Sequence, residues 1–347
     1  MSEVILHNQY HIAKIVIKPI QINQMKFNNK IILAILFFAA TVFISCKKEK
    51  EEPQKLDEQT SQFNSDANFY KSESDQADND INNSLSEIPA FGKVRSEASI
   101  LSSPLCGVTI DSSEISQKIL YYNFDGTTPC FSPSRTRSGQ IKVQLTEGAR
   151  WSDSGAVLTL TYVNFKVTRL FDSKSIMFNG VKTLKNLNGN NWLGFLTGTS
   201  TLRYQARALN MDVRFDNSWS AVWNAARITE WQYIPAGSSQ FIPYSHIKFT
   251  ASGDTTINGQ SNIDSWGVNR FGSSFVTRYY SPLVSNTYCG LWRFTSGELV
   301  HNVNSKNYTL TMGVDQTGNP TPYACAYGFK VTWIAANNTV QTIVLSY

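Results

Sequence analysis

The 347-residue sequence predicts an all-β protein, an antiparallel β-sandwich or an extended β-meander, preceded by a disordered N-terminal tether. From about residue 101 onward, Thr, Val, Ile, Tyr, Phe and Trp dominate, and turn residues recur roughly every ten positions. Residues 140–146 and 157–168 alternate apolar and polar side chains, which is the period of a half-buried strand. Together these observations favour a many-stranded antiparallel protein.

The predicted strands follow one another through the body, and no long helix is evident between them. An Asn-Gly pair is the strongest local hairpin signal, because a type I′ turn needs positive φ at both central positions. Asn179-Gly180 and Asn258-Gly259 therefore predict two hairpin turns. Residues 220–226 fit a helical turn as well as a strand. We predict strands at residues 118–124, 140–146, 157–168, 175–184, 199–205, 209–215, 227–234, 256–261, 275–280, 291–295, 308–314, 328–334 and 340–346.

The stretch from Met25 to Cys46 has the composition of an export signal. Lys26 and Lys30 give it a basic start, and an apolar run follows over residues 31–44. This run of about 14 residues is too short to span a bilayer as a helix but fits the hydrophobic region of a secretory signal peptide. We therefore predict a signal peptide over residues 25–45. Residues 1–24 are then an upstream extension, with a genuine N-terminal tail as the alternative.

The end of this signal resembles the lipobox of bacterial lipoproteins, in which a small residue precedes a cysteine that becomes the lipidated N-terminus. Ser45 and Cys46 hold those two positions, and Phe43 stands where Leu is usual. The charged residues 47–52 resemble the stretch that follows the lipidated cysteine in Bacteroidetes lipoproteins of the outer surface. The resemblance implies a lipid on Cys46 and a place in the outer membrane, with exposure at the cell surface.

Residues 46–100 are acidic, whereas the body is mildly basic. They hold 7 Lys and Arg against 12 Asp and Glu, while residues 101–347 hold 20 against 13. A segment so rich in charged and amide side chains cannot bury enough apolar surface to offset its ordering entropy. We therefore predict a flexible linker over residues 46–100 and a β-rich domain over 101–347, with two related halves left open. Because the basic residues of the body are scattered, nucleic acid is not an expected partner.

Five cysteines occur, and lipidation of Cys46 leaves an even four. In an oxidising compartment such a set predicts disulfide bonds. We favour Cys106–Cys130 and Cys289–Cys325, since each joins the partners that are closer in sequence, and four free thiols are the alternative.

No motif of a catalytic or metal site occurs. G-x-S-x-G, H-E-x-x-H and the phosphate-binding P-loop pattern are absent, and so is C-x-x-C. His246 and His301 are isolated from each other in sequence. We therefore predict neither a metal nor another cofactor, and no enzymatic activity.

A hydrolase with two carboxylates is the least favoured alternative. Glu230 is its most interesting residue, although an ion pair with Arg227 or a solvated strand face explains it more simply. Asp125 and Asp315 lie in Gly-containing turns, where an Asp side chain accepts hydrogen bonds from its own backbone.

Tryptophan side chains are the candidate ligand contacts, because sugar rings stack on flat apolar faces that carry a polar edge. Trp192 and Trp266 lie in loop-like surroundings, and Trp219 and Trp223 share a face if residues 219–223 form a strand. Packing in the core or on a sheet face is the alternative for each of them.

Several short motifs together resemble an uncharacterised family of Bacteroidetes surface lipoproteins, which combine a lipobox, a polar tether and a β-rich body with paired cysteines. The matching residues lie within 106–333. They are Tyr122-Asn123-Phe124-Asp125-Gly126 before Cys130, Arg137-Ser138-Gly139-Gln140-Ile141, Phe178-Asn179-Gly180-Val181-Lys182, Trp223-Asn224 with Arg227-Ile228-Thr229-Glu230-Trp231, Cys289-Gly290-Leu291-Trp292 and the turn before Cys325. The chain departs from the pattern at Gln316-Thr317-Gly318-Asn319, where a tighter Asp-Gly turn is usual. The resemblance implies fold and location and brings no activity with it.

The sequence thus predicts a lipid-anchored protein of the cell envelope without a catalytic site. The leading hypothesis is a module that binds a glycan or another polymer, or that serves adhesion. The alternative is a structural or assembly lipoprotein that contacts another envelope protein through a sheet face or edge.

Overall fold

The computed structural model describes residues 58–86, 88–92, 105–131, 134–190, 195, 201–291, 293–321, 323–335 and 337–347. All of them belong to one compact unit, Pro53–Tyr347. The predicted upstream extension, signal peptide and lipidated Cys46 lie outside the described residues, and so does Trp192. In the described part, no helix is both long enough and apolar enough to cross a membrane.

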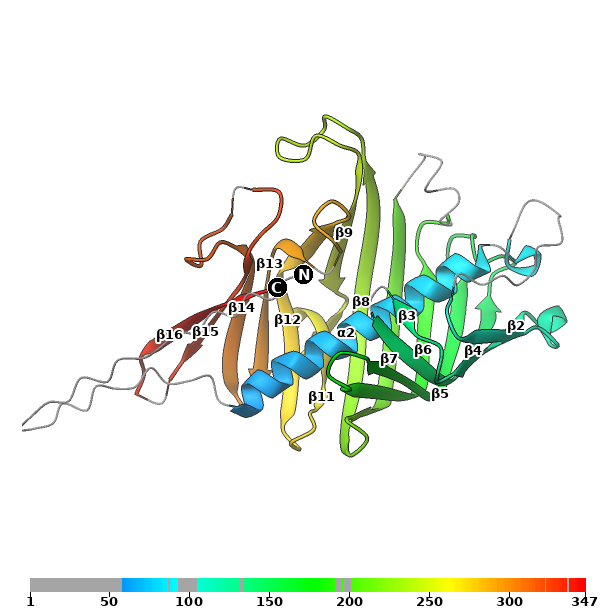
Figure 1. Cartoon of the computed structure of the whole chain (residues 1–347), viewed down its shortest axis with the longest axis horizontal. Coiled ribbons are helices and arrows are strands. Elements are labelled where there is room, and N and C mark those ends of the chain that lie inside the picture. Colours follow the sequence, from blue (N-terminus) through cyan, green and yellow to red (C-terminus); the bar gives the residue numbers. More distant parts are fainter. Residues whose placement is uncertain are drawn as a thin grey trace, which may run out of the picture. The chain divides into compact units, whose positions relative to one another are not determined.

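The prediction of an all-β antiparallel fold is confirmed, and the architecture is the meander rather than the sandwich. The described strands form one sheet in the order β1-β2-β4-β5-β6-β7-β8-β11-β12-β13-β14-β15-β16, with β3, β9 and β10 paired beside this path (Figure 1). The strands are β1 (Val108–Asp111), β2 (Ile119–Asp125), β3 (Cys130–Phe131), β4 (Ser134–Glu147), β5 (Val157–Arg169), β6 (Ser175–Asn186), β7 (Leu202–Phe215), β8 (Trp219–Ile234), β9 (His246–Gly253), β10 (Thr255–Ile257), β11 (Gln260–Val268), β12 (Ser274–Asn286), β13 (Phe294–Val303), β14 (Lys306–Val314), β15 (Gly328–Ile334) and β16 (Val340–Ser346). Short 3₁₀ turns lie at Pro89–Phe91 and Ile115–Gln117.

Two strand predictions change, and the choice left open at residues 220–226 is resolved. The described part of the strand predicted at 199–205 joins the strand predicted at 209–215 in the single strand β7, and residues 220–226 are strand rather than helical turn. The strand expected at 291–295 begins only at Phe294 and belongs to β13.

The two Asn-Gly pairs adopt different structures, and only one of them forms the predicted turn. Asn258-Gly259 forms the predicted hairpin turn between β10 and β11, with φ of 50° and 77°. The hairpin predicted at Asn179-Gly180 is wrong, because both residues lie inside β6 at a shift of register. There the side-chain oxygen of Asn179 accepts a hydrogen bond from the backbone N–H of Asn164 at 2.7 Å. Tertiary pairing on both sides therefore overrides the local turn preference.

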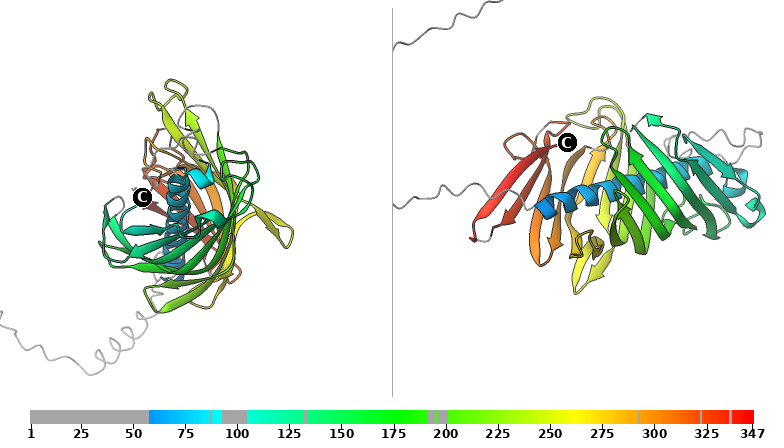
Figure 2. Two further views of the ribbon diagram at one scale, coloured as in Figure 1. Left: turned by 90° about the vertical axis from the view of Figure 1, so that its right-hand side faces the viewer. Right: turned by 60° about the horizontal axis from the view of Figure 1, so that its bottom comes forward.

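A row of β-bulges crosses the first half of the sheet. The register shifts at neighbouring places in the pairs β4–β5, β5–β6, β6–β7 and β7–β8. Positive φ marks the row at Gly139, Asn164, Gly180 and Asn210. Bulges increase the local bend and twist of a sheet. Seen end-on, the strands accordingly curve around the helix α2 (Figure 2).

The helix α2 (Glu58–Leu85, 28 residues) corrects the prediction of a flexible linker over this stretch. Phe63, Tyr70 and Ala77 repeat every seven residues and are buried in the same core as the inner side chains of the strands. The ring of Tyr70 stacks on Trp223 of β8 at 4.6 Å between centroids. The apolar stripe of the helix is narrow. Because acidic residues flank it, the composition of the segment as a whole reads as that of a polar linker.

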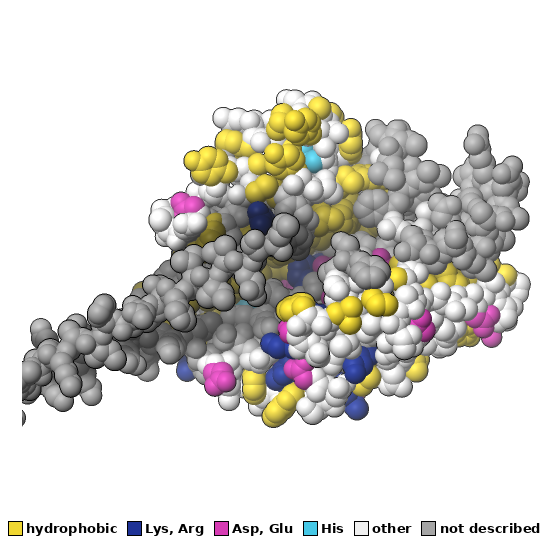
Figure 3. All heavy atoms as spheres, viewed as in Figure 1, with side chains coloured by type: hydrophobic (Ala, Val, Ile, Leu, Met, Phe, Trp, Pro, Cys, Tyr) yellow, Lys and Arg dark blue, Asp and Glu magenta, His cyan; other side chains and the backbone are white. Residues whose placement is uncertain are grey.

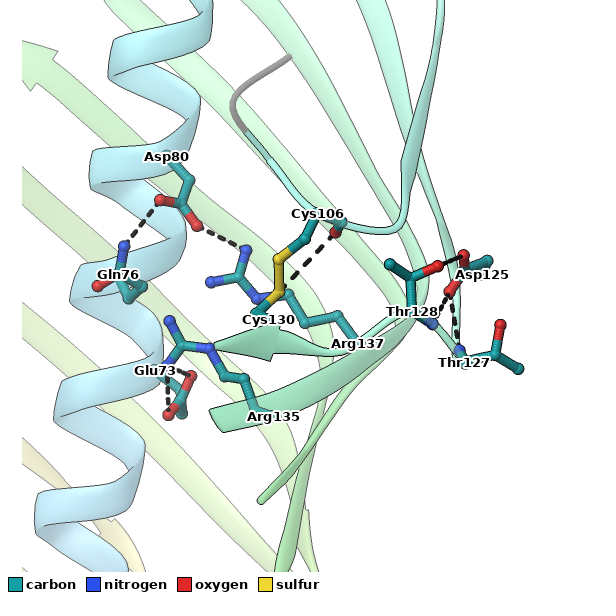
Figure 4. The surroundings of a disulfide bond; sticks show 10 residues. All are labelled: Glu73, Gln76, Asp80, Cys106, Asp125, Thr127, Thr128, Cys130, Arg135 and Arg137. Atoms are coloured by element: carbon teal, nitrogen blue, oxygen red, sulfur yellow. Dashed lines mark hydrogen bonds and ion pairs between the residues drawn. A yellow bond between two sulfur atoms is a disulfide. The ribbon is translucent and has the colours of Figure 1, made fainter. Parts of the chain in front are cut away.

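Both predicted disulfide pairings are confirmed. Cys106–Cys130 has a Cα–Cα distance of 5.6 Å and Cys289–Cys325 one of 5.3 Å, within the usual range for a bridge. The first bridge lies beside the C-terminal half of α2, where Figure 4 shows it with the ion pairs of Arg135 and Arg137.

Candidate binding groove

Acidic residues along one flank of α2 pair with arginines that approach from the sheet and its loops. The acidic members repeat every seven residues, so they lie on one line along the helix. The pairs are Asp66–Arg270 (2.6 Å), Glu73–Arg135 (2.8 Å) and Asp80–Arg137 (2.6 Å), of which Figure 4 shows the last two. Burial raises the pKa of Glu73 although Arg135 and Arg137 oppose that shift. These pairs fix the register of the helix across the sheet.

A second line of pairs runs along the other flank of α2. Arg227 of β8 binds Asp75 at 2.6 Å and the carboxylate of Asp264 at 2.5 and 2.9 Å. Lys182 of β6 binds Asp78 at 2.5 Å. Burial raises the pKa of Asp78 to about 6 despite the attraction of Lys182. Burial also disfavours the charged form of Asp75, but Arg227 and then the other nearby cations lower its pKa to about 2.

The face of α2 that points away from the sheet carries a different kind of side chain. Its residues follow one another at intervals of three or four, so they form one stripe. They are Ser65, Asn68, Ser72, Gln76 and Asn79, all exposed or half-buried. Hydroxyl and carboxamide groups offer both donors and acceptors without formal charge. We call this stripe the groove floor.

Beside the groove floor, the sheet supplies an apolar wall. The space between them has a volume of about 890 Å³, near the upper end of the size range of ligand sites. We define the groove wall as Leu184, Tyr204, Ala206, Trp231, Phe249, Phe294, Met312 and Phe329, which come from β6, β7, β8, β9, β13, β14 and β15. Figure 3 shows a hollow in this face with hydrophobic side chains on its upper side and a few charged side chains within it.

One end of the groove has a lip that carries stacked side chains. The guanidinium of Arg169 lies 4.7 Å from the ring centroid of Phe69 and 5.0 Å from that of Phe171, and it pairs with Asp172 at 2.6 Å. Arg169 and Phe69 line the groove. Phe171 is 78% exposed, so an unusually large apolar ring stands in solvent at this lip.

Of the tryptophans selected from the sequence, the three that the structure describes do not line the groove. Trp266 is not in a loop but in β11, where it pairs with Asn224 and Val276 and is half-buried. Trp219 is exposed at the start of β8, and Trp223 is fully buried against Phe63 and Tyr70. Ligand binding by these residues stays a prediction.

Trp231 lines the groove and was not selected by sequence reasoning, although it lies in a predicted strand. The signal that could have indicated the floor is the run of Ser, Asn and Gln at helical spacing within residues 65–79. That run is visible only once the segment is known to be a helix.

The acidic candidates have structural roles. Glu230 pairs with Arg203 at 3.1 Å, not with Arg227, which the acidic residues Asp75 and Asp264 occupy. Asp125 accepts hydrogen bonds from the backbone N–H groups of residues 127 and 128, as predicted for its turn.

Asp315 is bound in the same way by the backbone N–H groups of residues 317 and 319. His301 is buried, and its Nδ1 lies 2.7 Å from the hydroxyl of Thr277. Burial lowers the pKa of His301 to about 4. Among the described residues, no three His, Cys, Asp or Glu side chains gather closely enough to hold a metal ion.

Comparison of the chain with protein-family models, with curated proteins and with solved structures finds no match. The groove and its residues therefore carry the functional argument alone.

Proposed function

We propose that this chain is a lipid-anchored protein of the outer cell envelope that binds a glycan or similar polymer in the groove between α2 and the sheet. One observation carries the proposal: an aromatic and apolar wall and a floor of hydroxyl and carboxamide groups line the same groove. Sites for organic ligands combine a mostly apolar lining with a few placed polar groups. Binding rather than hydrolysis fits this lining, because its acidic residues Glu73, Asp75 and Asp78 are each held by a cation.

A binding screen tests the proposal. The full chain, reconstituted in phospholipid nanodiscs, is exposed to plant, host and bacterial glycans, with empty nanodiscs as background. We expect saturable binding that Ala206→Trp abolishes, because the larger side chain would fill the groove from its wall. Binding that survives this substitution would place the ligand elsewhere. Thermal unfolding of the variant checks that the substitution leaves the fold intact.

The location is tested separately. The export signal and the lipobox-like Ser45-Cys46 support a lipid on Cys46, and the two disulfides suit an oxidising compartment. We expect Cys46→Ala to release the protein from the membrane fraction and to abolish incorporation of a labelled fatty acid. A membrane-impermeant label on intact cells reports exposure at the surface.

A second candidate function is contact with another envelope protein. The loop between β8 and β9 exposes Phe241 and Tyr244, and the ring of Tyr244 stacks on that of Tyr288 at 6.5 Å. Exposed aromatic residues are enriched at the centres of protein interfaces. Replacement of Tyr244 and Tyr288 by Ser would abolish cross-linking to an envelope protein if this candidate holds, while leaving glycan binding unchanged.

A further inference from the structure

We propose that the groove selects an uncharged, chain-like ligand and holds it lengthwise along α2, so that a neutral oligosaccharide fits and an anionic one does not. This inference rests on the proposed function and names its ligand class. The mildly basic body, with 20 Lys and Arg against 13 Asp and Glu over residues 101–347, would by itself favour an anionic polymer. The arrangement of the charges removes that preference.

The cations that face α2 are already neutralised. Arg135, Arg137, Lys182, Arg227 and Arg270 have side chains no more than 8% exposed, and each is paired with a carboxylate of α2. None of these five is therefore available to a ligand without breaking a buried pair. The five carboxylates, whose side chains are between 5% and 21% exposed, are held by these cations in turn.

Among the described residues, the two remaining cations of the groove lining are also paired. Lys71 binds Asp75 at 2.8 Å and lies over the ring of Phe249. Arg169 binds Asp172 at the lip. An anionic ligand would thus lose water without gaining a free cation, and an unpaired charge in such a site is strongly unfavourable.

The groove floor supplies the hydrogen bonds that an uncharged ligand needs. Gln76 donates one hydrogen bond to Asp80 at 2.7 Å and Ser72 donates one to the carbonyl oxygen of Phe69. The remaining donors and acceptors of the five side chains suit hydroxyl groups whose orientation alternates along a chain. From Ser65 to Asn79 the floor extends about 21 Å at the helical rise of 1.5 Å per residue. A ligand of several repeating units is therefore held along the helix axis rather than across it.

The groove wall supplies the complementary contact. Trp231 and Phe249 pack against each other with ring centroids 4.6 Å apart, and Phe294 and Phe329 lie farther along the same side. Aromatic rings give large contact area for little loss of conformational entropy. Trp231 and Phe249 are only 5% and 7% exposed, so the apolar faces of sugar rings would lie mainly on the half-buried Phe294 and Phe329 while their hydroxyl groups face the floor. At the lip, Phe171 extends the aromatic surface into solvent.

The test compares neutral and anionic probes on the full chain in nanodiscs. Maltoheptaose, cellohexaose and mannohexaose are the neutral probes, and oligogalacturonate and a heparin oligosaccharide are the anionic ones. Calorimetric titration is done in low and in high NaCl. We expect at least one neutral probe to bind with an affinity that salt leaves unchanged, because screening acts only on charged partners. The anionic probes should bind at least tenfold more weakly.

Variants then locate the bound chain. Gln76→Ala and Asn79→Ala should each weaken binding about five- to tenfold, the usual effect of losing one hydrogen bond. Asn83→Ala is the matched control, since Asn83 is exposed on the same side of α2 but does not line the groove, and it should change nothing. Thr229→Phe provides a second block of the groove if Ala206→Trp fails to fold.

The outcomes separate the inference from the proposed function. Salt-sensitive binding of an anionic probe that Ala206→Trp abolishes would overturn the inference and leave the function intact. Binding of dodecyl maltoside but of no neutral oligosaccharide would show that the wall holds an alkyl chain, which also overturns the inference. If no probe of any class responds to the groove-filling variants, the proposed function itself fails.

Discussion

At the scale of single residues, the buried ion pairs are the most sensitive points of the molecule. Arg227 is buried in β8 and holds two carboxylates, one from α2 and one from β11. The positive charge of the guanidinium stabilises the negative charge of each carboxylate, because the interior offers little water to solvate it. Such a group fixes geometry more than it adds net stability, since taking the charges out of water offsets much of their attraction.

Replacement of Arg227 by Ala should therefore lower the free energy of unfolding strongly. Asp264 would be left without a cation in the interior and Asp75 would keep only Lys71, and removal of one member of such a pair typically costs about 3–5 kcal/mol. Urea unfolding measures the loss. Arg203→Ala is the control on the neighbouring strand, because its pair with Glu230 is exposed and worth at most about 1 kcal/mol. Equal losses in the two variants would contradict this account.

His301 should make the stability of the protein depend on pH. In the unfolded chain it takes up a proton below its usual pKa of 6.5, whereas burial delays protonation in the folded chain to about pH 4. Stability should therefore fall as the pH drops from 6.5 to 4, by about 3 kcal/mol from this residue. We expect His301→Asn to flatten the pH dependence of urea unfolding in that range.

Asp78 should act in the opposite direction. Its folded carboxyl takes up a proton below about pH 6, and the unfolded one only near 3.8, so acidification through this window adds stability. Asp78→Asn should thus make stability fall more steeply as the pH drops from about 6 to 4, whereas His301→Asn should make it fall less steeply. A curve that neither variant changes would show that other groups set the pH dependence.

At the scale of elements, the bulge row gives the sheet its curvature around α2. Gly139 in β4 has φ of 88°, and a Cβ atom there would come within 2.1 Å of the backbone oxygen of Asn164 in β5. The two strands thus approach more closely than any side chain allows. Gly155 has nearly the same φ of 84° but open space around the position of its Cβ.

These two glycines make a matched pair of substitutions. Gly155→Ala should cost only the strain of positive φ, about 1–2 kcal/mol. Gly139→Ala should cost clearly more, because the strands must also separate. Thermal unfolding compares the two variants with the parent chain. Similar costs would mean that the close approach at Gly139 relaxes without loss.

The strands could be predicted from the sequence because their alternation is a local pattern. The helix could not, because its acidic residues look solvated until their partners are known. Asp66, for example, meets Arg270 from 204 positions away. The groove could not be predicted from the sequence for the same reason. Its wall comes from several strands between β6 and β15, and its floor comes from the segment that was expected to be a linker.

At the scale of the whole molecule, α2 is part of the core rather than a neighbour of it. The boundary at residue 101 that composition suggests would separate the β-rich domain from this helix. Five buried cations of the sheet and its loops would lose the carboxylates that α2 supplies, and the apolar side chains around Tyr70 and Phe63 would meet water.

We therefore expect residues 101–347 alone to be unfolded or aggregated, whereas residues 53–347 fold cooperatively. Circular dichroism and sedimentation measure the difference. Addition of a peptide of residues 58–86 should restore the folded signal of the shorter piece, and a peptide with Glu73 and Asp75 changed to Lys should not. A stable, monomeric 101–347 fragment would show that the sheet does not depend on the helix.

The position of α2 in the chain has a mechanical consequence. Only twelve positions separate Cys46 from the first residue of the helix, so a pull on a lipid at Cys46 would reach the sheet through Glu58. The helix crosses many strands, and its ion pairs are spaced along its whole length. A force along the helix axis would load these pairs together, in shear, instead of opening them one at a time. A lipid attached at Cys46 would then transmit force to many strands at once through α2, rather than to a single strand at the edge of the sheet.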